Sequence, residues 1–273
     1  MRILFIGDIF GKPGRDVTRR ALPALVETAS IDFVMANVEN AAAGFGVTGD
    51  IADAILSYGV DVMTSGNHIW DKKEVLDYIP RQQKLLRPAN FPAGVPGRGS
   101  YLGRTRTGEP IGVLNLMGRV FMTPLDDPFA IALREVEALR AKARVIVVDF
   151  HAEATSEKVA MCWHLDGRVT AVIGTHTHVQ TADERILPKG TACLTDAGMT
   201  GPHDSIIGVT IDAALGRFRN SMPVKFEAAT GPGRLNAVIV TADPATGRAT
   251  GIERLNLSMS EVEALSEKPA PAQ

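Results

Sequence analysis

The sequence predicts a single-domain α/β fold in which helices flank mostly parallel strands. Short apolar runs alternate with amphipathic helical stretches through the first half of the 273-residue chain. That alternation favours parallel strands joined by right-handed crossovers. After Gly174 the pattern changes to short strand-like runs separated by turn residues, which indicates antiparallel strands beside the parallel ones.

The elements of the first part follow in order from the hydrophobic periodicity of each segment. Strands are predicted at residues 3–6, 33–38, 60–64, 111–116, 145–150 and 169–173, where apolar residues are consecutive. Helices are predicted at residues 15–28, 50–58, 72–79 and 129–143, where apolar residues recur at helical spacing. Pro23 predicts a break or kink in the first helix, because proline lacks an N–H and clashes with the preceding turn. Residues 88–103, rich in Pro and Gly, are typical of a long loop.

The C-terminal part is predicted to add short strands at residues 192–194, 224–227, 237–241 and 252–257, with a hairpin turn at 243–247. No shift in composition marks a linker between domains. We therefore expect one domain over residues 1–265. A disordered tail is expected over residues 266–273, which contain Pro269 and Pro271.

Composition excludes several classes of protein. Hydrophobic residues make up 45% and charged residues 22% of the chain, which rules out a wholly disordered protein. The formal net charge of -2 argues against a broad basic surface for duplex nucleic acid, although a local patch stays open. No apolar run approaches the roughly 18 residues of a membrane helix, and the N-terminal run is too short for a secretory signal. We expect a cytoplasmic protein without membrane association.

The two cysteines, Cys162 and Cys193, are too few for a disulfide framework. We therefore expect a reducing compartment, in which each thiol acts as a small buried hydrophobic group.

Polar side chains follow five of the predicted strands, just past the carboxyl end of each. They are Asp8, Glu39, Asn40, Asn67, His68, His151, His176 and His178. In a parallel α/β sheet these strand ends lie on one edge, where ligands bind. If residues 174–178 stay extended, His176 and His178 project to the same side. Each group alone is compatible with a turn, a cap or a structural role, but their recurrence after five strands indicates a shared site.

The chemistry of this set points to metal ions. Imidazole, carboxylate and amide ligands together suit Mn, Fe, Zn or similar divalent ions. The set is too large for one tetrahedral site and suffices for two ions bridged by a shared carboxylate. Two ions roughly 3.5–4 Å apart can hold the attacking and leaving oxygens of an in-line phosphoryl displacement.

Four motifs resemble the calcineurin-like metallophosphoesterase superfamily in order and spacing. They are Gly7-Asp8, Gly66-Asn67-His68, an isolated His151 after a strand, and Gly174-Thr175-His176-Thr177-His178. Longer segments, at residues 38–41, 66–71, 149–158 and 195–202, resemble a bacterial branch, the YmdB-type phosphodiesterases that act on 2′,3′-cyclic nucleotides. The resemblance covers most of the chain. It implies a metallophosphoesterase-like two-sheet sandwich flanked by helices, and a metal-dependent phosphoric diester hydrolase.

Two residues depart from the superfamily pattern. Phe10 stands where the superfamily usually has a His, and Glu39 stands where the bridging acid is usually Asp. The resemblance to the bacterial branch implies that Asn40 replaces the missing His. The implied ligands are Asp8, Glu39, Asn40 and His178 for the first metal, and Glu39, Asn67, His151 and His176 for the second. An oxygen ligand in place of an imidazole favours Fe or Mn over Zn.

This inventory predicts a mechanism of phosphodiester hydrolysis. A metal-bound hydroxide attacks phosphorus, since metal binding lowers the pKa of water to about 7 from about 15.7. His68 is predicted to be the general acid that protonates the leaving ribose oxygen, or alternatively only to hydrogen-bond the phosphate. Phe45, in a glycine-rich loop, is a candidate for stacking on a base. His203 is a candidate for lining the substrate pocket.

Several functions remain open at this point. The resemblance implies 2′,3′-cyclic mononucleotides as substrates, with a phosphomonoesterase or a broader phosphodiesterase on the same centre as the first alternative. A metal-bound regulatory or interaction protein with incidental catalysis is the second. An RNA nuclease is the third, disfavoured by the acidic pI. The expected partner is a small-molecule phosphodiester, and a homo-oligomer is compatible with the sequence, without a predicted interface.

Overall fold

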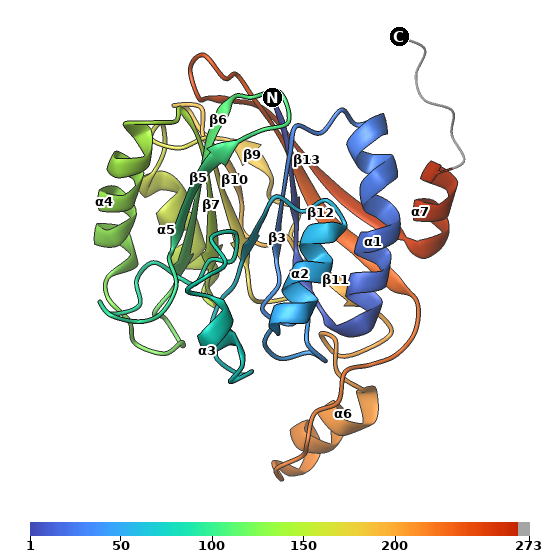
Figure 1. The fold of residues 1–273 in the computed structure, drawn as a ribbon. Coiled ribbons are helices and arrows are strands. Elements are labelled where there is room, and N and C mark those ends of the chain that lie inside the picture. The colour runs from blue at the N-terminus through green and yellow to red at the C-terminus, as the bar shows by residue number, and fades with distance from the viewer. Residues whose placement is uncertain (267–273) are drawn as a thin grey trace.

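The computed structural model describes residues 1–266 as two β-sheets packed face to face, with helices on the outer face of each (Figure 1). This arrangement confirms the predicted α/β two-sheet sandwich. Of the expected tail over residues 266–273, only Ser266 lies in the described part of the chain, as the last residue of a helix. The assignment of one domain stays a prediction. Within residues 1–266 no helix has both the length and the apolar character to cross a membrane.

The first sheet is mixed, and β1 lies near its middle. Its order is β2-β11-β12-β1-β3-β4, with β13 paired to β12. The strands are β1 (Arg2–Ile6), β2 (Asp8–Ile9), β3 (Phe33–Asn37), β4 (Val62–Thr64), β11 (Met199–Pro202), β12 (Gly233–Ala242) and β13 (Ala249–Ser258). Strands β1, β3 and β4 are parallel and therefore end at one edge, whereas β12 runs antiparallel to β1.

The second sheet has the order β5-β6-β7-β8-β10-β9. Its strands are β5 (Ser100–Arg104), β6 (Pro110–Met117), β7 (Val145–His151), β8 (Ala171–Thr175), β9 (Arg185–Ile186) and β10 (Ala192–Leu194). Strands β6, β7, β8 and β10 are parallel, and the edge strands β5 and β9 are antiparallel to their neighbours. The prediction of an unbroken loop over residues 88–103 is wrong at its end, because β5 begins at Ser100.

Hydrophobic clusters fill the three interfaces between these layers. One lies between the two sheets. A second packs the first sheet against α1 (Gly11–Thr28), α2 (Gly49–Ser57), the short α3 (Val75–Tyr78) and α7 (Met259–Ser266). The third packs the second sheet against α4 (Pro128–Arg140) and α5 (Thr155–His164). Along β1, Ile3 and Phe5 enter the first cluster while Leu4 and Ile6 enter the second, which explains why its apolar residues are consecutive.

Helix α1 continues through Pro23, so the predicted break is wrong. Pro23 is exposed, and the carbonyl that loses its helical partner there can be hydrated. Leu22 and Leu25 are buried on either side of it and hold both turns against the sheet. The helix also begins earlier than expected. The first turn of the helix lies close to β11, and Gly14 allows this approach because a Cβ at that position would lie 2.2 Å from the carbonyl oxygen of Thr200.

The segment that precedes β12 differs most from the prediction. Residues 224–227 form no strand; they lead back from α6 (Ile211–Asn220), a helix that the sequence analysis did not predict. Phe226 packs near Phe10 and Val209 in a small separate cluster instead of joining a sheet. Among the residues of α6 only Ala214 is buried, and the helix projects beyond the body of the molecule (Figure 1).

Cys162 and Cys193 form a disulfide, which corrects the expectation of two free thiols. Both side chains are buried as expected, each with 1% of its surface exposed. Cys162 lies on α5 and Cys193 on β10, and the packing of the helix on the sheet brings their Cα atoms within 6.0 Å. The sequence does not reveal this packing. The expected reducing compartment rested on free thiols and loses that support.

Candidate metal centre

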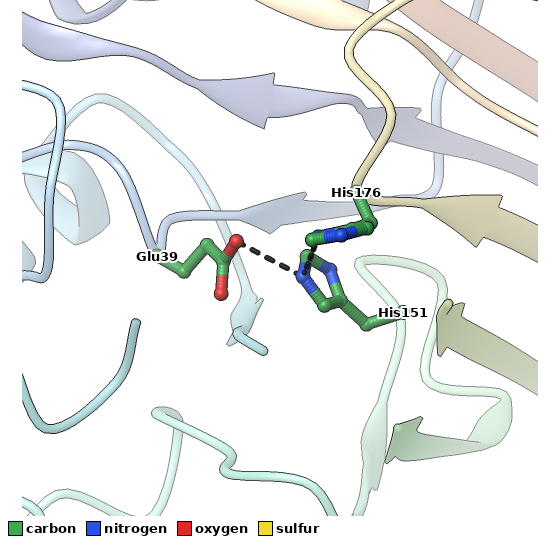
Figure 2. Close-up of side chains that lie close together, drawn as sticks. All are labelled: Glu39, His151 and His176. Atoms are coloured by element: carbon green, nitrogen blue, oxygen red, sulfur yellow. Dashed lines mark hydrogen bonds and ion pairs between the residues drawn. The ribbon is translucent and has the colours of Figure 1, made fainter. Parts of the chain in front are cut away.

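The predicted metal ligands and His68 gather at one edge of the sandwich. They are Asp8 in β2, Glu39 and Asn40 after β3, Asn67 and His68 after β4, His151 at the end of β7, and His176 and His178 after β8. The first five residues come from the first sheet and the three other histidines from the second. Figure 2 shows Glu39 directed at His151 and His176 across the gap between the sheets. The site therefore exists only because the two sheets end at the same edge.

Three polar atoms converge on Nε2 of His151. Glu39 Oε1, Asn67 Oδ1 and His176 Nδ1 each lie 3.0 Å from this nitrogen. A ring nitrogen offers one proton or one lone pair, so it cannot satisfy three such neighbours. One ligand atom from each of Glu39, His151 and His176 lies within 4.8 Å of the other two. A cation among these atoms would satisfy them together, so this cluster fits a metal ion.

A buried relay holds the other ring nitrogen of His151. Its Nδ1 lies 2.9 Å from Thr175 Oγ1, and that hydroxyl donates to Asp149 Oδ1 over 2.7 Å. Because Thr175 gives its proton to Asp149, its oxygen accepts from Nδ1 of His151, and Nε2 is left facing the cluster. Asn37 links the relay to Glu39: it donates to Asp149 over 3.0 Å and accepts from the Glu39 backbone N–H over 3.1 Å.

Burial and mutual charge perturb every titratable member of the cluster. Burial favours a neutral Glu39 carboxyl, but the charge and hydrogen bond of His151 outweigh this and lower its pKa to about 2. Burial likewise disfavours a charged His151, yet Glu39 raises the pKa of His151 to about 9. Burial and the charge of His151 lower the pKa of His176 to about 3. Without metal, His151 therefore carries a second proton, on Nε2, and its positive charge attracts the Glu39 carboxylate.

Asp8, Asn40 and His178 adjoin this cluster. Asp8 is fully buried, and burial raises the pKa of its carboxyl. Its Oδ2 accepts from the His176 backbone N–H over 3.2 Å, while its buried Oδ1 has no hydrogen-bond partner within residues 1–266. Asn40 Nδ2 lies 3.1 Å from His178 Nε2 and 3.4 Å from Glu39 Oε1. An orphaned buried carboxylate oxygen beside an amide and an imidazole fits a second cation.

The loop that carries His176 and His178 is not extended, so the predicted reason for their shared direction is wrong. Strand β8 ends at Thr175, and the two histidines have φ angles of 100° and 66°. Such angles are unfavourable for residues with a Cβ and persist only where contacts enforce them. Asp196 provides these contacts, because its Oδ2 accepts from the backbone N–H of Thr177 (3.1 Å) and from its hydroxyl (2.6 Å).

Asp196 is itself held by a buried cation. Lys158 on α5 donates to Asp196 Oδ2 over 2.7 Å, and the two side chains are 3% and 1% exposed. Asp196 Oδ1 accepts from the Gly198 backbone N–H over 2.8 Å. The motif segments at residues 149–158 and 195–202 thus meet behind the histidine loop and anchor it.

His68 lies at the mouth of the site. Its backbone N–H donates to Glu39 Oε2 over 3.0 Å, and its Nδ1 lies 2.8 Å from Asp71 Oδ2. Since a carboxylate accepts, Nδ1 carries the proton and Nε2 is the second ring nitrogen available for chemistry. Phe45 packs edge-on against the ring, with 5.2 Å between ring centroids.

A cavity of about 740 Å³ opens in front of these residues. Its wall includes Glu39, Asn40, His68, Glu153, His176 and His178, as well as Phe45. It continues to α6, where Arg217 and Phe218 line it. His203 is not among the lining residues; its Nε2 donates to the carbonyl of Met199 over 2.9 Å. The structure therefore places Phe45 at the cavity and His203 away from it.

Sequence reasoning missed three supporting groups: the Asp149–Thr175 relay, the Lys158–Asp196 pair and the residues of α6. The relay had a signal, because Asp149 is the only carboxylate in a strand whose other residues, apart from His151, are apolar. A carboxylate at such a position is rarely buried without a specific partner. The Lys158–Asp196 pair had no comparable signal, since it depends on which segments meet in space. Helix α6 had one, because Ile211, Ala214, Leu215 and Phe218 recur at helical spacing.

Comparisons with known proteins agree with the fold and identify the family. A family model described as YmdB-like protein matches residues 4–255. The chain is 49% identical over 255 residues to the 2′,3′-cyclic-nucleotide 2′-phosphodiesterase of Bacillus subtilis (strain 168), covering 93% of this chain and 96% of that protein. A crystal structure of a Thermus thermophilus protein superimposes with a TM-score of 0.88 at 42% identity, covering 94% and 99% of the two chains. A crystal structure of a Mycoplasma pneumoniae phosphatase also superimposes with a TM-score of 0.88, at 33% identity, covering 94% of this chain and 93% of that one.

The family model spans most of the chain, and the relatives match it over almost their whole length. The resemblance predicted from the short motifs is confirmed. This chain belongs to the YmdB-like protein family.

Proposed function

We propose that this chain is a phosphodiesterase that hydrolyses 2′,3′-cyclic nucleotides with the help of two metal ions. The convergence of Glu39, Asn67 and His176 on Nε2 of His151, beside a cavity, is the observation that carries the proposal. The 49% identity to a 2′,3′-cyclic-nucleotide 2′-phosphodiesterase supports the substrate class and cleavage of the 2′ ester bond, which leaves a 3′-phosphate.

The residues that would hold the metals form two sets with Glu39 in common. Asp8, Glu39, Asn40 and His178 make up one set, and Glu39, Asn67, His151 and His176 make up the other. The unpartnered Oδ1 of Asp8 supports the first set, and the convergence on His151 supports the second. Bound metal ions supply an activated water and positive charge opposite the phosphate. The oxygen-rich first set favours Fe or Mn over Zn.

His68 is the proposed proton donor. In the hydrolysis, a water oxygen bonds to phosphorus as the bond between phosphorus and the ribose 2′ oxygen breaks, and the leaving oxygen takes up a proton. The contact of Nδ1 with Asp71 orients the ring, so that a second proton, taken up on Nε2, is the one to be delivered to the leaving oxygen. Phe45, packed against the same ring, offers an apolar face to the nucleobase.

Hydrolysis of 2′,3′-cyclic AMP, with identification of the product as the 3′- or 2′-monophosphate, tests this function. We expect turnover with Mn or Fe, a 3′-phosphate product, and loss of activity on chelation. His68→Ala is expected to slow turnover by at least about 100-fold at unchanged metal content. His164→Ala is the matched control, because His164 lies on α5, bonded to the Phe129 carbonyl and away from the cavity.

Other outcomes would redirect the proposal. No hydrolysis of the cyclic nucleotide by fully metal-loaded protein would overturn it. Faster hydrolysis of a simple phosphomonoester than of the cyclic diester would favour the phosphomonoesterase alternative.

A further inference from the structure

Arg217 faces the active-site cavity without a partner for its charge. It is the only Lys or Arg among the described residues that line the cavity. Within residues 1–266 its side chain makes no hydrogen bond and no ion pair; its guanidinium lies over Phe226, with Cζ 5.2 Å from the ring centroid. Stacking occupies a face of the guanidinium and leaves the N–H groups on its edge free. Such a fork matches the oxygens of a phosphate.

The segment that carries Arg217 is tied to the metal centre. We call residues 203–232, which include α6, the α6 arm. At its start, the Ile207 carbonyl accepts from Nδ1 of His178 over 2.8 Å. Phe10, whose ring centroid lies 5.7 Å from that of His178, packs in one small cluster with Ala214 and Phe226 of the arm. Although α6 projects from the body in Figure 1, these contacts set its place relative to the metal ligands.

The cavity wall has more recognition surface than a cyclic mononucleoside phosphate uses. The reacting phosphate belongs at the metal ligands and His68, and its base has Phe45 beside it. The α6 arm adds a cationic group, Arg217, and further aromatic rings, Phe226 and the 80% exposed Phe218. A substrate with a second phosphate and a second base could place the phosphate at Arg217 and the base against these aromatic rings.

We propose that Arg217 binds a second phosphate group, the one on the 5′ oxygen of the 2′,3′-cyclic nucleotide. The 5′ carbon and the 2′,3′ ring leave opposite faces of the ribose, so a 5′-phosphate can meet the α6 arm while the cyclic phosphate occupies the metal centre. The preferred substrates are then 5′-phosphorylated, either as free nucleotides or as the cyclic-phosphate end of an oligoribonucleotide. This inference rests on the proposed function and adds a determinant of specificity to it.

Three substrates test the inference: adenosine 2′,3′-cyclic phosphate, its 5′-phosphorylated form, and the dinucleotide ApA ending in a 2′,3′-cyclic phosphate. Both phosphorylated substrates are expected to have kcat/KM about 10- to 100-fold higher than the first, because a charge-assisted pair forms only with them. The gain should lie mainly in KM, since the contact is distant from the reacting bond. A further gain for the dinucleotide assigns the oligoribonucleotide end as the source of the phosphate, and equal values assign the free nucleotide.

Arg217→Met is expected to bring the ratio of kcat/KM between phosphorylated and unphosphorylated substrates close to one. Arg219→Met, on the same helix but outside the cavity lining, should keep the ratio of the unaltered protein. Equal kcat/KM for all three substrates would overturn the inference and leave the proposed function standing. An equal loss of kcat on all three in Arg217→Met would place Arg217 at the reacting phosphate and also overturn it. No turnover of any substrate would remove both proposals.

Discussion

Gly66 packs directly against the ring of His151. A Cβ at position 66 would lie 2.1 Å from Cδ2 and 2.2 Å from Nε2 of that ring, far inside van der Waals contact. The turn cannot easily retreat, because Asn115 accepts from the Ser65 N–H and donates to the Ser65 carbonyl, both over 2.9 Å. The absence of a side chain at position 66 is therefore what lets His151 present Nε2 to the cluster.

Gly66→Ala should displace His151 and weaken metal binding. We expect overpacking to cost about 1–3 kcal/mol of stability and Mn affinity to fall at least about tenfold. Urea unfolding of the metal-free protein and calorimetric titration with Mn measure the two effects. Gly216→Ala is the control, because a Cβ at this helical position meets no atom within 4 Å. Normal metal affinity in Gly66→Ala would contradict the packing argument.

Asp196→Asn should loosen the histidine loop and leave the Lys158 ammonium buried without its ion pair. Breaking one side of such a pair costs about 3–5 kcal/mol. Adding Lys158→Met should recover part of that stability but not the metal affinity, since the introduced amide has one acceptor oxygen and cannot accept from both Thr177 and the Gly198 backbone N–H as the Asp196 carboxylate does. Urea unfolding and Mn titration of the single and double variants test this separation. Parallel recovery of stability and metal affinity would show that Asp196 acts only through Lys158.

Metal binding at the Glu39–His151–His176 cluster should release about one proton near pH 7. The pKa of His151, raised to about 9 by Glu39, means that Nε2 carries a proton that the metal must replace. His176, with a pKa lowered to about 3, is already neutral and releases none. The apparent affinity should thus rise about tenfold per pH unit from pH 6 to pH 8. Calorimetry in buffers of different ionisation enthalpy counts the protons, and a pH-independent affinity would refute the assignment.

The Cys162–Cys193 disulfide should raise the free energy of unfolding, and this contribution should be lost when the bond is reduced. It closes a loop of 31 residues, which corresponds to about 3–4 kcal/mol in the chain-entropy model. Urea unfolding with and without reductant should reveal this difference, whereas a Cys162→Ala/Cys193→Ala variant should respond to reductant hardly at all. Two titratable thiols in protein denatured without reductant would show that the bond does not form.

Much of the fold could be predicted from local patterns. The apolar runs in β1, β3, β7 and β8 were found because both faces of these strands are buried, which leaves a continuous signal. Helix α6 was missed although Ile211, Ala214, Leu215 and Phe218 recur at helical spacing. Among these only Ala214 is buried, so the apolar face of this helix is largely exposed instead of packing into the core. The break at Pro23 was wrong because packing of Leu22 and Leu25 outweighs the loss of one hydrogen bond.

The sequence by itself determined which chemical groups follow the strand ends, since strand direction sends Asp8, Glu39 and Asn67 to one edge of the first sheet, and His151 and His176 to one edge of the second. Only the tertiary structure decided how they meet. The facing of two sheets brought Glu39 to His151, and helix packing brought Cys162 to Cys193. The positive φ angles of His176 and His178 depend on an anchor, Asp196, that is distant in sequence. The α6 arm placed Arg217 at the cavity. The apolar periodicity of a segment shows that one of its faces is buried but not which distant segment covers that face, and for that reason no local pattern could predict these contacts.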